Sequence, residues 1–563
     1  MSGPAGGDEP DDGGRSSILA SSAVMAAGTT VSRLSGYVRS ALLVAALGSG
    51  LHAELFNIAN TVPNMLYILL AGGIFNAVLV PQLVRSQKQD ADGGEAYTNR
   101  VVTAAALFLG VVTIALVVAA PWVMQLYLSD AYDSARLAEH QQSVIDFARF
   151  CLPQVFFYGM FVLLGQILNA RGRFGPMMWA PIANNLIAVA VLVTYLVAFR
   201  PAEGAELVGP FSPGEETLLG LGSTIGIVAQ LLVLVPVLRA AGIRLRPRFD
   251  LRGTGLGHTL RLGVWTVLFV IVNQIAYTVV VNLASSGPAE AGPGDPGTGY
   301  TVYSFAFLIV MVPHSIITVS LATAALPQLS RYAADGDLTR LAATLTSTLR
   351  SALAIVVPFA LLLPLVARDT AHVIWGYGAG KDNYEVFAPT LALFGIGLVF
   401  FTVHYLMLRG FYALERTRTV FLIQCVIAAV NVAAALVLVR QATAEQTSPA
   451  LVLAYAASYV VGAGVSSAVL ARGLGGLGFR ALAWFAARLL LVATVSTAGA
   501  WVAARLLQGL GEDPALVVAL LRAGAVALVD VVLFVALARL ARLTEVTDVL
   551  DTVTRRFPTR RGT

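Results

Sequence analysis

The residues of this chain that could do chemistry are charged and amide side chains set inside apolar sequence. One long apolar run contains Ser32, Arg33 and Arg39, and the next opens with Glu54 and continues with three asparagines. Such groups are costly at bilayer depth and normally face a water-filled cavity or one another. We therefore predict a polar cavity that binds a charged or polar ligand. Its expected binding residues are Ser32, Arg33, Arg39, Glu54, Asn57, Asn60, Asn64, Asn273 and Gln274.

Helical periodicity orients the first of these runs. Ser32, Ser35 and Arg39 are spaced i, i+3 and i+7, which places them on one face of a helix. Arg33 points roughly 120° away from Arg39, because six residues turn about 100° each. Serine and asparagine can also simply let helices pack and hydrogen-bond, and both interpretations stay open for them. For Arg39, well inside its run, we favour a functional role.

A second polar group lies far along the chain, where Asn273 and Gln274 occupy the middle of another apolar run. Their amides could hydrogen-bond a sugar or a pyrophosphate, or they could join neighbouring helices. His314 and His404 also lie deep in apolar runs. Each could couple transport to protons, but a hydrogen-bonded histidine that packs helices together is the favoured interpretation.

Catalytic and cofactor motifs are missing from the sequence. It has no phosphate-binding glycine loop with its lysine, no HExxH, no GxSxG and no CxxC. Cys151 and Cys425 lie in apolar runs without metal-ligand spacing. We therefore expect no enzyme activity, no cofactor, no metal site and no nucleic-acid partner, and any transport must draw on an ion gradient, the membrane potential or the gradient of the substrate.

Composition determines the broad class. Of 563 residues, 57% are hydrophobic and 12% charged, far from the balance of soluble domains. Runs of about 20 apolar residues, long enough to cross a bilayer, recur from end to end. We predict an all-α polytopic membrane protein with about fourteen transmembrane helices. The expected spans are 18–46, 54–86, 98–128, 143–169, 175–199, 216–240, 257–285, 300–330, 340–367, 385–412, 418–440, 447–471, 481–508 and 514–540.

Two sequence pairs indicate an internal repeat. Pro81-Gln82-Leu83-Val84-Arg85 is matched by Pro327-Gln328-Leu329-Ser330-Arg331, and Ala170-x-x-Arg173 by Ala413-x-x-Arg416. Six helices separate the members of each pair, so the repeats run in the same direction and predict two six-helix lobes around a central cavity. Two extra helices follow the second lobe.

Loop charges predict the orientation. Arginines gather in alternate loops, which places those loops and both termini in the cytoplasm. The expected segments are a disordered acidic tail (1–16), a first lobe (17–240), a basic cytoplasmic linker (241–256), a second lobe (257–472), a final helix pair (473–541) and a basic cytoplasmic tail (542–563). In the final pair, Arg488 and Asp530 lie inside apolar runs, and we expect them to pair with each other.

The chain resembles the MurJ (MviN) lipid II flippases of the multidrug/oligosaccharidyl-lipid/polysaccharide exporter superfamily. The resemblance spans nearly the whole chain and is most specific in residues 28–88, where Ser32 to Arg39, Val62-Pro63-Asn64 and Val80-Pro81-Gln82-Leu83 carry it. It implies a bacterial plasma-membrane protein that moves an undecaprenyl-pyrophosphate-linked peptidoglycan precursor between leaflets by alternating access. It also implies that Arg33 and Arg39 hold the pyrophosphate and that the last two helices receive the lipid tail.

The sequence departs from this family at four positions. The family's second-helix arginine and glutamate fall on Tyr67 and Gly72, and those of its eighth helix fall on Leu308 and Met311. Two alternatives therefore stay open: a cation-coupled drug or metabolite antiporter of the same superfamily, and a non-transporting scaffold for cell-wall assembly. The expected partners are the lipid-linked glycan precursor, membrane lipids and cell-wall synthesis proteins.

Overall fold

A computed structural model describes residues 12–69, 94–250, 256–292, 297–507 and 515–547 of the chain. Every regular element within these residues is a helix, which confirms the all-α class. The helices are α1 (Asp12–Leu47), α2 (Leu51–Ala59), α3 (Thr61–Leu69), α5 (Glu95–Val118), α6 (Ala120–Gln125), α7 (Ala138–Cys151), α8 (Gln154–Ala170), α9 (Gly175–Ala198), α10 (Pro213–Leu232), α11 (Leu234–Ala240), α12 (Leu256–Glu290), α13 (Tyr300–Pro313), α14 (Val319–Ala334), α15 (Leu338–Trp375), α16 (Phe387–Ala413), α17 (Thr417–Val439), α18 (Thr447–Leu474), α19 (Phe479–Leu507) and α20 (Leu516–Leu540).

These helices follow the predicted spans closely. Twelve segments of the described chain are long and apolar enough to cross a membrane. Helix α1 and the α2–α3 pair supply the two polar segments at the start, so the fold agrees with an expectation of about fourteen spans. The second predicted span, 54–86, is described only as far as residue 69, and the first copy of the Pro-Gln-Leu repeat lies outside the described residues.

Prolines divide several of the long spans. A proline within a few residues accompanies the breaks between α5 and α6, α7 and α8, and α10 and α11. A proline ring removes one backbone donor and clashes with the carbonyl four residues earlier, so the helix bends there. In the eighth span, Pro313 ends α13, and a π-helical turn over His314–Thr318 (η5) links it to α14.

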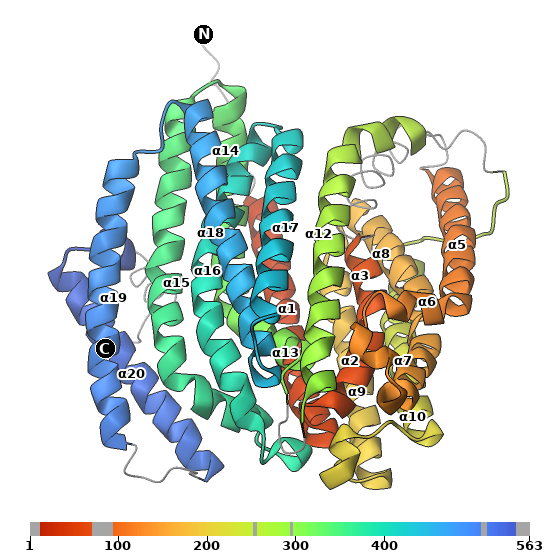
Figure 1. Ribbon diagram of the computed structural model, residues 1–563. Helices are drawn as coiled ribbons and strands as arrows, with labels where there is room; N and C mark the ends of the chain where they lie inside the picture. Colours follow the sequence, from red (N-terminus) through yellow and green to blue (C-terminus); the bar gives the residue numbers. More distant parts are fainter. Residues whose placement is uncertain (1–11, 70–93, 251–255, 293–296, 508–514, 548–563) are drawn as a thin grey trace, which may run out of the picture.

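Two groups of helices form the two lobes of the molecule (Figure 1). In the first lobe, α1 packs on α9, α9 on α10, and α5 on α8; in the second, α16 packs on α15 and α18, and α17 on α12 and α18. The α19–α20 pair packs against α15 on the flank of the second lobe. We propose 17–240 and 257–472 as the lobe boundaries, because packing is densest within these ranges.

The basic linker between the lobes is held against α5. The backbone N–H of Arg246 donates to Asn99 Oδ1 at 3.0 Å, and that of Arg248 donates to Thr103 Oγ1 at 2.9 Å. The guanidinium of Arg100 forms an ion pair with Asp250 at 2.7 Å. Residues 244–250 therefore form an extended strap along α5.

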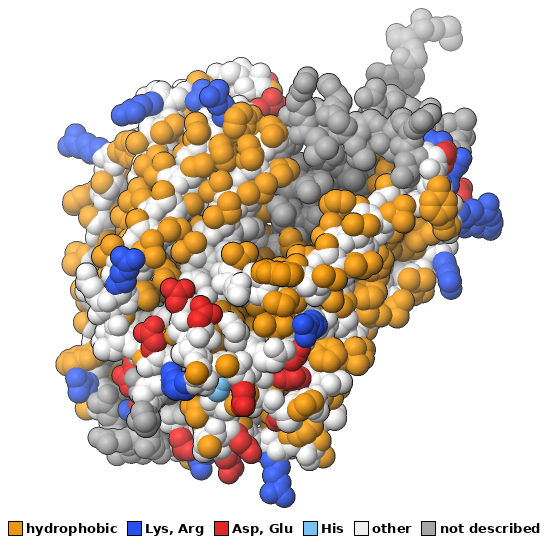
Figure 2. Space-filling model, turned by 45° about the vertical axis from the view of Figure 1, so that its right-hand side comes forward, with side chains coloured by type: hydrophobic (Ala, Val, Ile, Leu, Met, Phe, Trp, Pro, Cys, Tyr) orange, Lys and Arg blue, Asp and Glu red, His pale blue; other side chains and the backbone are white. Residues whose placement is uncertain are grey.

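The surface has an apolar belt between two charged regions (Figure 2). On α5, the side chains of Val111 and Ile114 are 69% and 67% exposed, which suits a face that contacts lipid. We call one end of the molecule the acidic end, after the carboxylates in its loops: Asp130, Asp133, Glu203, Glu206, Asp382, Glu385 and Glu445. We call the opposite end the basic end, after Arg171, Arg173, Arg244, Arg246, Arg248 and Arg416.

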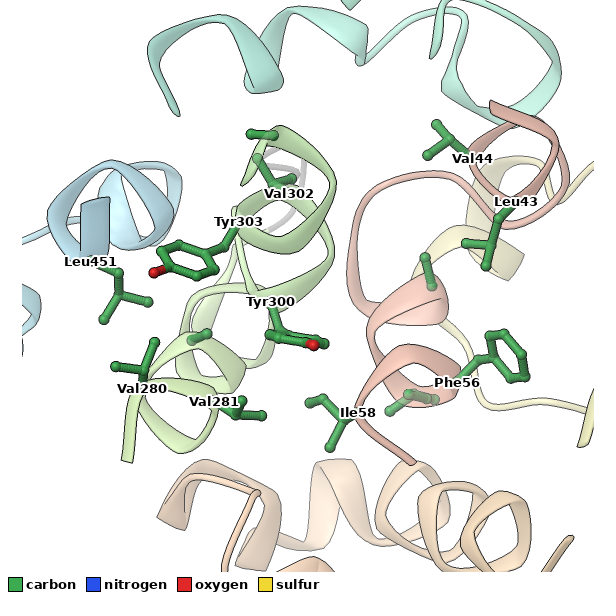
Figure 3. Close-up of a cluster of buried hydrophobic side chains, with 14 of the residues drawn as sticks. Leu43, Val44, Phe56, Ile58, Val280, Val281, Tyr300, Val302, Tyr303 and Leu451 are labelled. Carbon is green, nitrogen blue, oxygen red and sulfur yellow. The ribbon is translucent and has the colours of Figure 1, made fainter. Parts of the chain in front are cut away.

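A buried apolar cluster joins the lobes near the acidic end (Figure 3). The side chains labelled in Figure 3 come from α1, α2, α12, α13 and α18: Leu43, Val44, Phe56, Ile58, Val280, Val281, Tyr300, Val302, Tyr303 and Leu451. All ten are at most 7% exposed. The two lobes are thus tightly packed together at this end of their interface.

Candidate substrate cavity

A polar cavity of about 290 Å³ lies between the lobes, on the basic side of the apolar cluster. Helices α1, α2, α3, α8 and α9 form its wall in the first lobe, and α13 forms its wall in the second. Its lining residues are Gly36, Arg39, Ser40, Leu43, Asn57, Asn60, Thr61, Asn64, Tyr158, Asn185, Tyr300, Ser304, Phe305 and Leu308. Four of the nine predicted site residues, Arg39, Asn57, Asn60 and Asn64, therefore share one cavity.

Arg39 is the charged side chain of this lining. It is half-buried, and within the described chain its guanidinium forms no hydrogen bond and no ion pair. Removing such a cation from water is unfavourable unless an anion or ordered water satisfies its five donors. A planar guanidinium matches phosphate oxygens through two parallel hydrogen bonds. The cavity is therefore suited to a phosphate-bearing ligand.

The three asparagines differ in what they already bind. Asn57 Nδ2 donates to Thr301 Oγ1 at 2.9 Å, and Gln154 Nε2 donates to Asn60 Oδ1 at 3.2 Å. Asn64 is exposed to the cavity. Because the first two amides keep free donors or acceptors beside these bonds, all three can hydrogen-bond a polar headgroup.

Ser32 and Arg33 lie outside this lining, towards the basic end. Asn185 Nδ2 donates to the Ser32 carbonyl at 3.0 Å and to Ser35 Oγ at 2.8 Å, so Ser32 contributes its backbone oxygen to helix packing. Arg33 is half-buried and lies on α1, which packs against α13 of the second lobe. It lies about 9 Å along the helix from Arg39, since six residues rise 1.5 Å each.

Glu54 occupies a different place from the one predicted. Its side chain is fully buried, and its carboxylate accepts hydrogen bonds from the backbone N–H groups of Tyr300 and Thr301, at 2.5 and 2.8 Å. Thr301 Oγ1 also donates to it at 2.8 Å. Glu54 thus caps the first turn of α13 and is not part of the cavity lining. An anionic cap is favourable because the first N–H groups of a helix lack partners within the helix.

Asn273 and Gln274 also lie outside the cavity lining. Gln424 Nε2 donates to Asn273 Oδ1 at 3.2 Å, and Gln274 Nε2 donates to the Met65 carbonyl at 2.6 Å. The first contact joins α12 to α17 and the second joins α12 to α3. Of the two interpretations left open for these amides, the structure supports the joining of helices.

Sequence reasoning missed four polar residues of the lining: Ser40, Tyr158, Asn185 and Tyr300. The signal for Asn185 was available, because Asn184 and Asn185 form an amide pair inside the apolar run 175–199. The signal for Tyr300 was weak, because a tyrosine at the start of a transmembrane helix is also common at the membrane surface.

The four residues at which the sequence departs from the family pattern lie in different surroundings. Leu308 lies in the cavity lining, so an apolar side chain stands on that wall. Met311 is 8% exposed and belongs to the apolar cluster. The side chain of Tyr67 and all of Gly72 lie outside the described residues.

The buried ion pair of the last two helices differs from the predicted one. Arg488 donates to the backbone carbonyl of Ala541, and Asp530 accepts hydrogen bonds from Ser496 and Thr497 at 3.1 and 3.2 Å. The predicted Arg488–Asp530 pair is therefore wrong. Arg522 forms the pair instead: its Nε donates to Asp369 Oδ2 on α15 at 2.7 Å, with both side chains less than 10% exposed.

The two deep histidines lie in hydrogen-bonded, packed surroundings. His314 Nδ1 lies 3.2 Å from Thr402 Oγ1, and His404 Nδ1 lies 3.3 Å from Ser466 Oγ. The His314 ring also contacts the rings of Phe401 and Tyr405. Both contacts match the favoured interpretation of helix packing.

The sequence is similar to those of lipid II flippases of the MurJ family. The sequence matches the family model described as "Lipid II flippase MurJ" over residues 43–517. A probable lipid II flippase MurJ of Rhizobium meliloti (strain 1021) is 26% identical over 445 residues, covering 78% of each chain. A lipid II flippase MurJ of Burkholderia cenocepacia is 26% identical over 397 residues, covering 69% of this chain and 72% of the relative.

Comparison with solved structures concerns the fold. A structure described as "Lipid II flippase MurJ, inward closed conformation" is similar with a TM-score of 0.69 and 14% identity, covering 92% of this chain and 98% of that one. An inward-facing multidrug resistance transporter of the MATE family is similar with a TM-score of 0.61 and 14% identity, covering 78% and 94%. The fold of this chain is thus similar to the folds of both structures.

Proposed function

Because this chain belongs to the MurJ family of lipid II flippases, we propose that it moves a lipid-linked peptidoglycan precursor from the cytoplasmic to the outer leaflet of the bacterial plasma membrane by alternating access. The observation that carries this proposal is the guanidinium of Arg39 in the interlobe cavity, which has no ion-pair partner among the described residues. The undecaprenyl pyrophosphate of such a precursor is an anion that this guanidinium can bind through two oxygens. The substrate tail stays in lipid while the headgroup enters the cavity.

The cavity amides have a supporting role in this proposal. Asn60 and Asn64 lie on the same wall as Arg39 and can hydrogen-bond the sugars of the headgroup. Leu308 provides an apolar surface opposite. In this proposal Arg39 binds the pyrophosphate, and the amides distinguish a glycan-bearing headgroup from a bare phosphate.

The contacts near the acidic end form the closed side of the transport path. Glu54 and Asn57 of α2 bind Thr301 of α13, and the apolar cluster packs beside them. We propose that the basic end faces the cytoplasm, with both termini there, because arginine-rich loops are retained on that side. Headgroup release then requires the lobes to separate at the acidic end, where the Glu54 contacts must break.

The acids of the described chain do not favour the antiporter alternative. A cation-coupled exporter needs a carboxylate that can bind Na⁺ or H⁺ in its cavity. The Glu54 carboxylate is hydrogen-bonded to α13, and Asp146 forms an ion pair with Arg149 at 2.8 Å. Asp530 accepts hydrogen bonds from two hydroxyl groups. None of these three belongs to the cavity lining.

The test is flipping of lipid II by the purified chain in proteoliposomes. Arg39→Gln keeps a polar side chain but removes the charge, and we expect at least a tenfold lower rate, since a hydrogen bond to a charged group contributes about 1.5–3 kcal/mol. Arg340→Gln is the control, because Arg340 is exposed, pairs with Asp337 and does not belong to the cavity lining. Normal flipping by Arg39→Gln at equal protein level would remove the basis of the proposal.

A further inference from the structure

Arg409 of α16 lies against two tyrosine rings. Its guanidinium lies over the ring of Tyr405, 4.4 Å from the centroid, and 6.0 Å from that of Tyr412. One of its nitrogens donates to the Tyr405 hydroxyl, and its buried Nε has no hydrogen-bond acceptor. No acid lies within ion-pair distance in the described part of the chain. Stacking on aromatic rings orients a guanidinium without neutralising its charge.

The sequence repeat relates α16 of the second lobe to α8 of the first. Helix α8 ends at Ala170 and helix α16 ends at Ala413, the two alanines of the Ala-x-x-Arg repeat. Tyr158, twelve residues before Ala170, lines the cavity. Phe401, twelve residues before Ala413, is its counterpart, and its ring contacts His314. Arg409 lies two turns beyond Phe401 towards the basic end.

Arg33 approaches the same region from the first lobe. Arg33 lies on α1, which packs against α13, and the His314 ring at the end of α13 is 4.8 Å from that of Tyr405, on which Arg409 stacks. Arg33 lies fourteen residues before the end of α1, and His314 lies fourteen residues after the start of α13. Both are therefore roughly 21 Å from the acidic ends of their helices, whereas Arg39 is roughly 12 Å from that end.

From these positions we propose that Arg33 and Arg409 together form a second anion site, on the basic side of the Arg39 cavity, that takes the pyrophosphate of the lipid-linked substrate before Arg39 does. The inference rests on the proposed function and extends it. Two guanidinium groups from opposite lobes, without carboxylates, repel each other unless an anion lies between them. Arg409 thereby provides from α16 a cation that Leu308 does not provide from α13.

A double-mutant cycle tests whether the two arginines bind one anion. The full chain in nanodiscs is titrated with lipid II, and the Kd is measured for Arg33→Gln, Arg409→Gln and the double variant. We expect each single substitution to raise Kd about tenfold. The double variant should raise Kd by much less than the product of the two single effects, because removing either arginine already weakens binding of the shared anion. Fully multiplicative effects would overturn the shared site.

The control is Arg418→Gln. Arg418 also lies in the second lobe and stacks on an aromatic ring, 5.5 Å from the centroid of Trp265, but it belongs to α17. Arg409→Lys, which keeps the charge but loses the planar fork, should give an intermediate Kd. If Arg409→Gln matches Arg418→Gln while Arg39→Gln abolishes flipping, the second site is disproved and the proposed function stands. If Arg39→Gln flips normally, the function itself fails.

Discussion

The carboxylate of Glu54 on α2 accepts two hydrogen bonds from Thr301 on α13, one from its backbone N–H and one from its hydroxyl, both at 2.8 Å. The bonds connect the two lobes at the acidic end, where Glu54 is fully buried. Separating the lobes would expose both the carboxylate and the unpaired N–H groups of the α13 N-terminus. We therefore propose that this contact helps to hold the lobes together at the acidic end.

Glu54→Gln should shift the population towards the state that is open at the acidic end. Glutamine retains an acceptor but loses the negative charge, and charge-assisted bonds of this kind contribute about 1.5–3 kcal/mol, so roughly a tenfold increase in opening is expected. The measurement is labelling of Ser304→Cys, in the cavity lining, by an impermeant thiol reagent added outside intact cells. Cys151 and Cys425 are replaced in this background.

The matched control for that experiment is Glu385→Gln. Glu385 also lies at the acidic end, but its carboxylate pairs with Arg368 at an exposed position. Surface pairs of this kind contribute little. Equal labelling of the two variants would mean that Glu54 does not hold the lobes together.

Asn57→Cys with Thr301→Cys should form a disulfide that stops transport. The two native side chains are in contact, with 2.9 Å between Asn57 Nδ2 and Thr301 Oγ1, and they belong to different lobes. Oxidation should abolish flipping and reduction should restore it. The control pair is Ser143→Cys with Glu216→Cys, which contact each other at 2.6 Å within the first lobe and outside the cavity lining. If the two pairs respond alike to oxidation, lobe separation is not required.

Gly378→Ala should also weaken closure at the acidic end. Gly378 has a φ of +51°, and an added Cβ would lie 2.2 Å from the carbonyl oxygen of Ala45, so α1 and the 378–380 turn (η6) could no longer meet. Gly336→Ala controls for backbone strain alone, because Gly336 has a φ of +70° with open space around it. We expect Gly378→Ala to increase Ser304→Cys labelling and Gly336→Ala to leave it unchanged.

Arg522→Ala should destabilise the protein strongly, since it leaves Asp369 charged and buried. Removing one partner of a buried pair typically costs about 3–5 kcal/mol. Arg368→Ala, which removes a half-exposed partner of Glu385, should cost no more than about 1 kcal/mol. Thermal melting in detergent compares the two. Asp369→Ala combined with Arg522→Ala should recover part of the lost stability, and a double variant worse than either single one would contradict the pairing.

Removing the charge of Asp250 should loosen the strap of residues 244–250 on α5. Hydrogen bonds from Arg100 hold the pKa of this carboxyl below its usual range. The ionised form is thus favoured in the folded state, so the contact is fully present at neutral pH and is lost as pH falls through the lowered pKa. Asp250→Asn should speed tryptic cleavage at residues 244–248 at pH 8, whereas Asp335→Asn should not.

Much of the fold could be predicted locally. A bilayer requires about 20 apolar residues for each span, so the helices, their approximate limits and the depth of Arg39 follow from hydrophobicity along the chain. The polar stripe of Asn57, Asn60 and Asn64 follows from helical periodicity in the same way, and three residues of that stripe do line one cavity with Arg39.

Contacts between side chains on different helices could not be predicted in this way. Arg488 and Asp530 were expected to pair because they lie on consecutive helices, but α15 packs against α20 and places Asp369 beside Arg522. Glu54 was expected in the cavity and instead caps α13, because the second lobe brings that helix start to it.

The sequence by itself determined which segments enter the membrane and which side chains are unusual there. Only the tertiary structure decided whether each polar group meets a partner or the cavity. The physical reason is the separation in sequence between the residues involved. Burial of an apolar span is a property of consecutive residues, whereas neutralising a buried charge depends on which distant helix packs against it. Packing places Asp369 beside Arg522, whereas Arg39 has no carboxylate beside it in the described part of the chain, which leaves its charge available for a ligand.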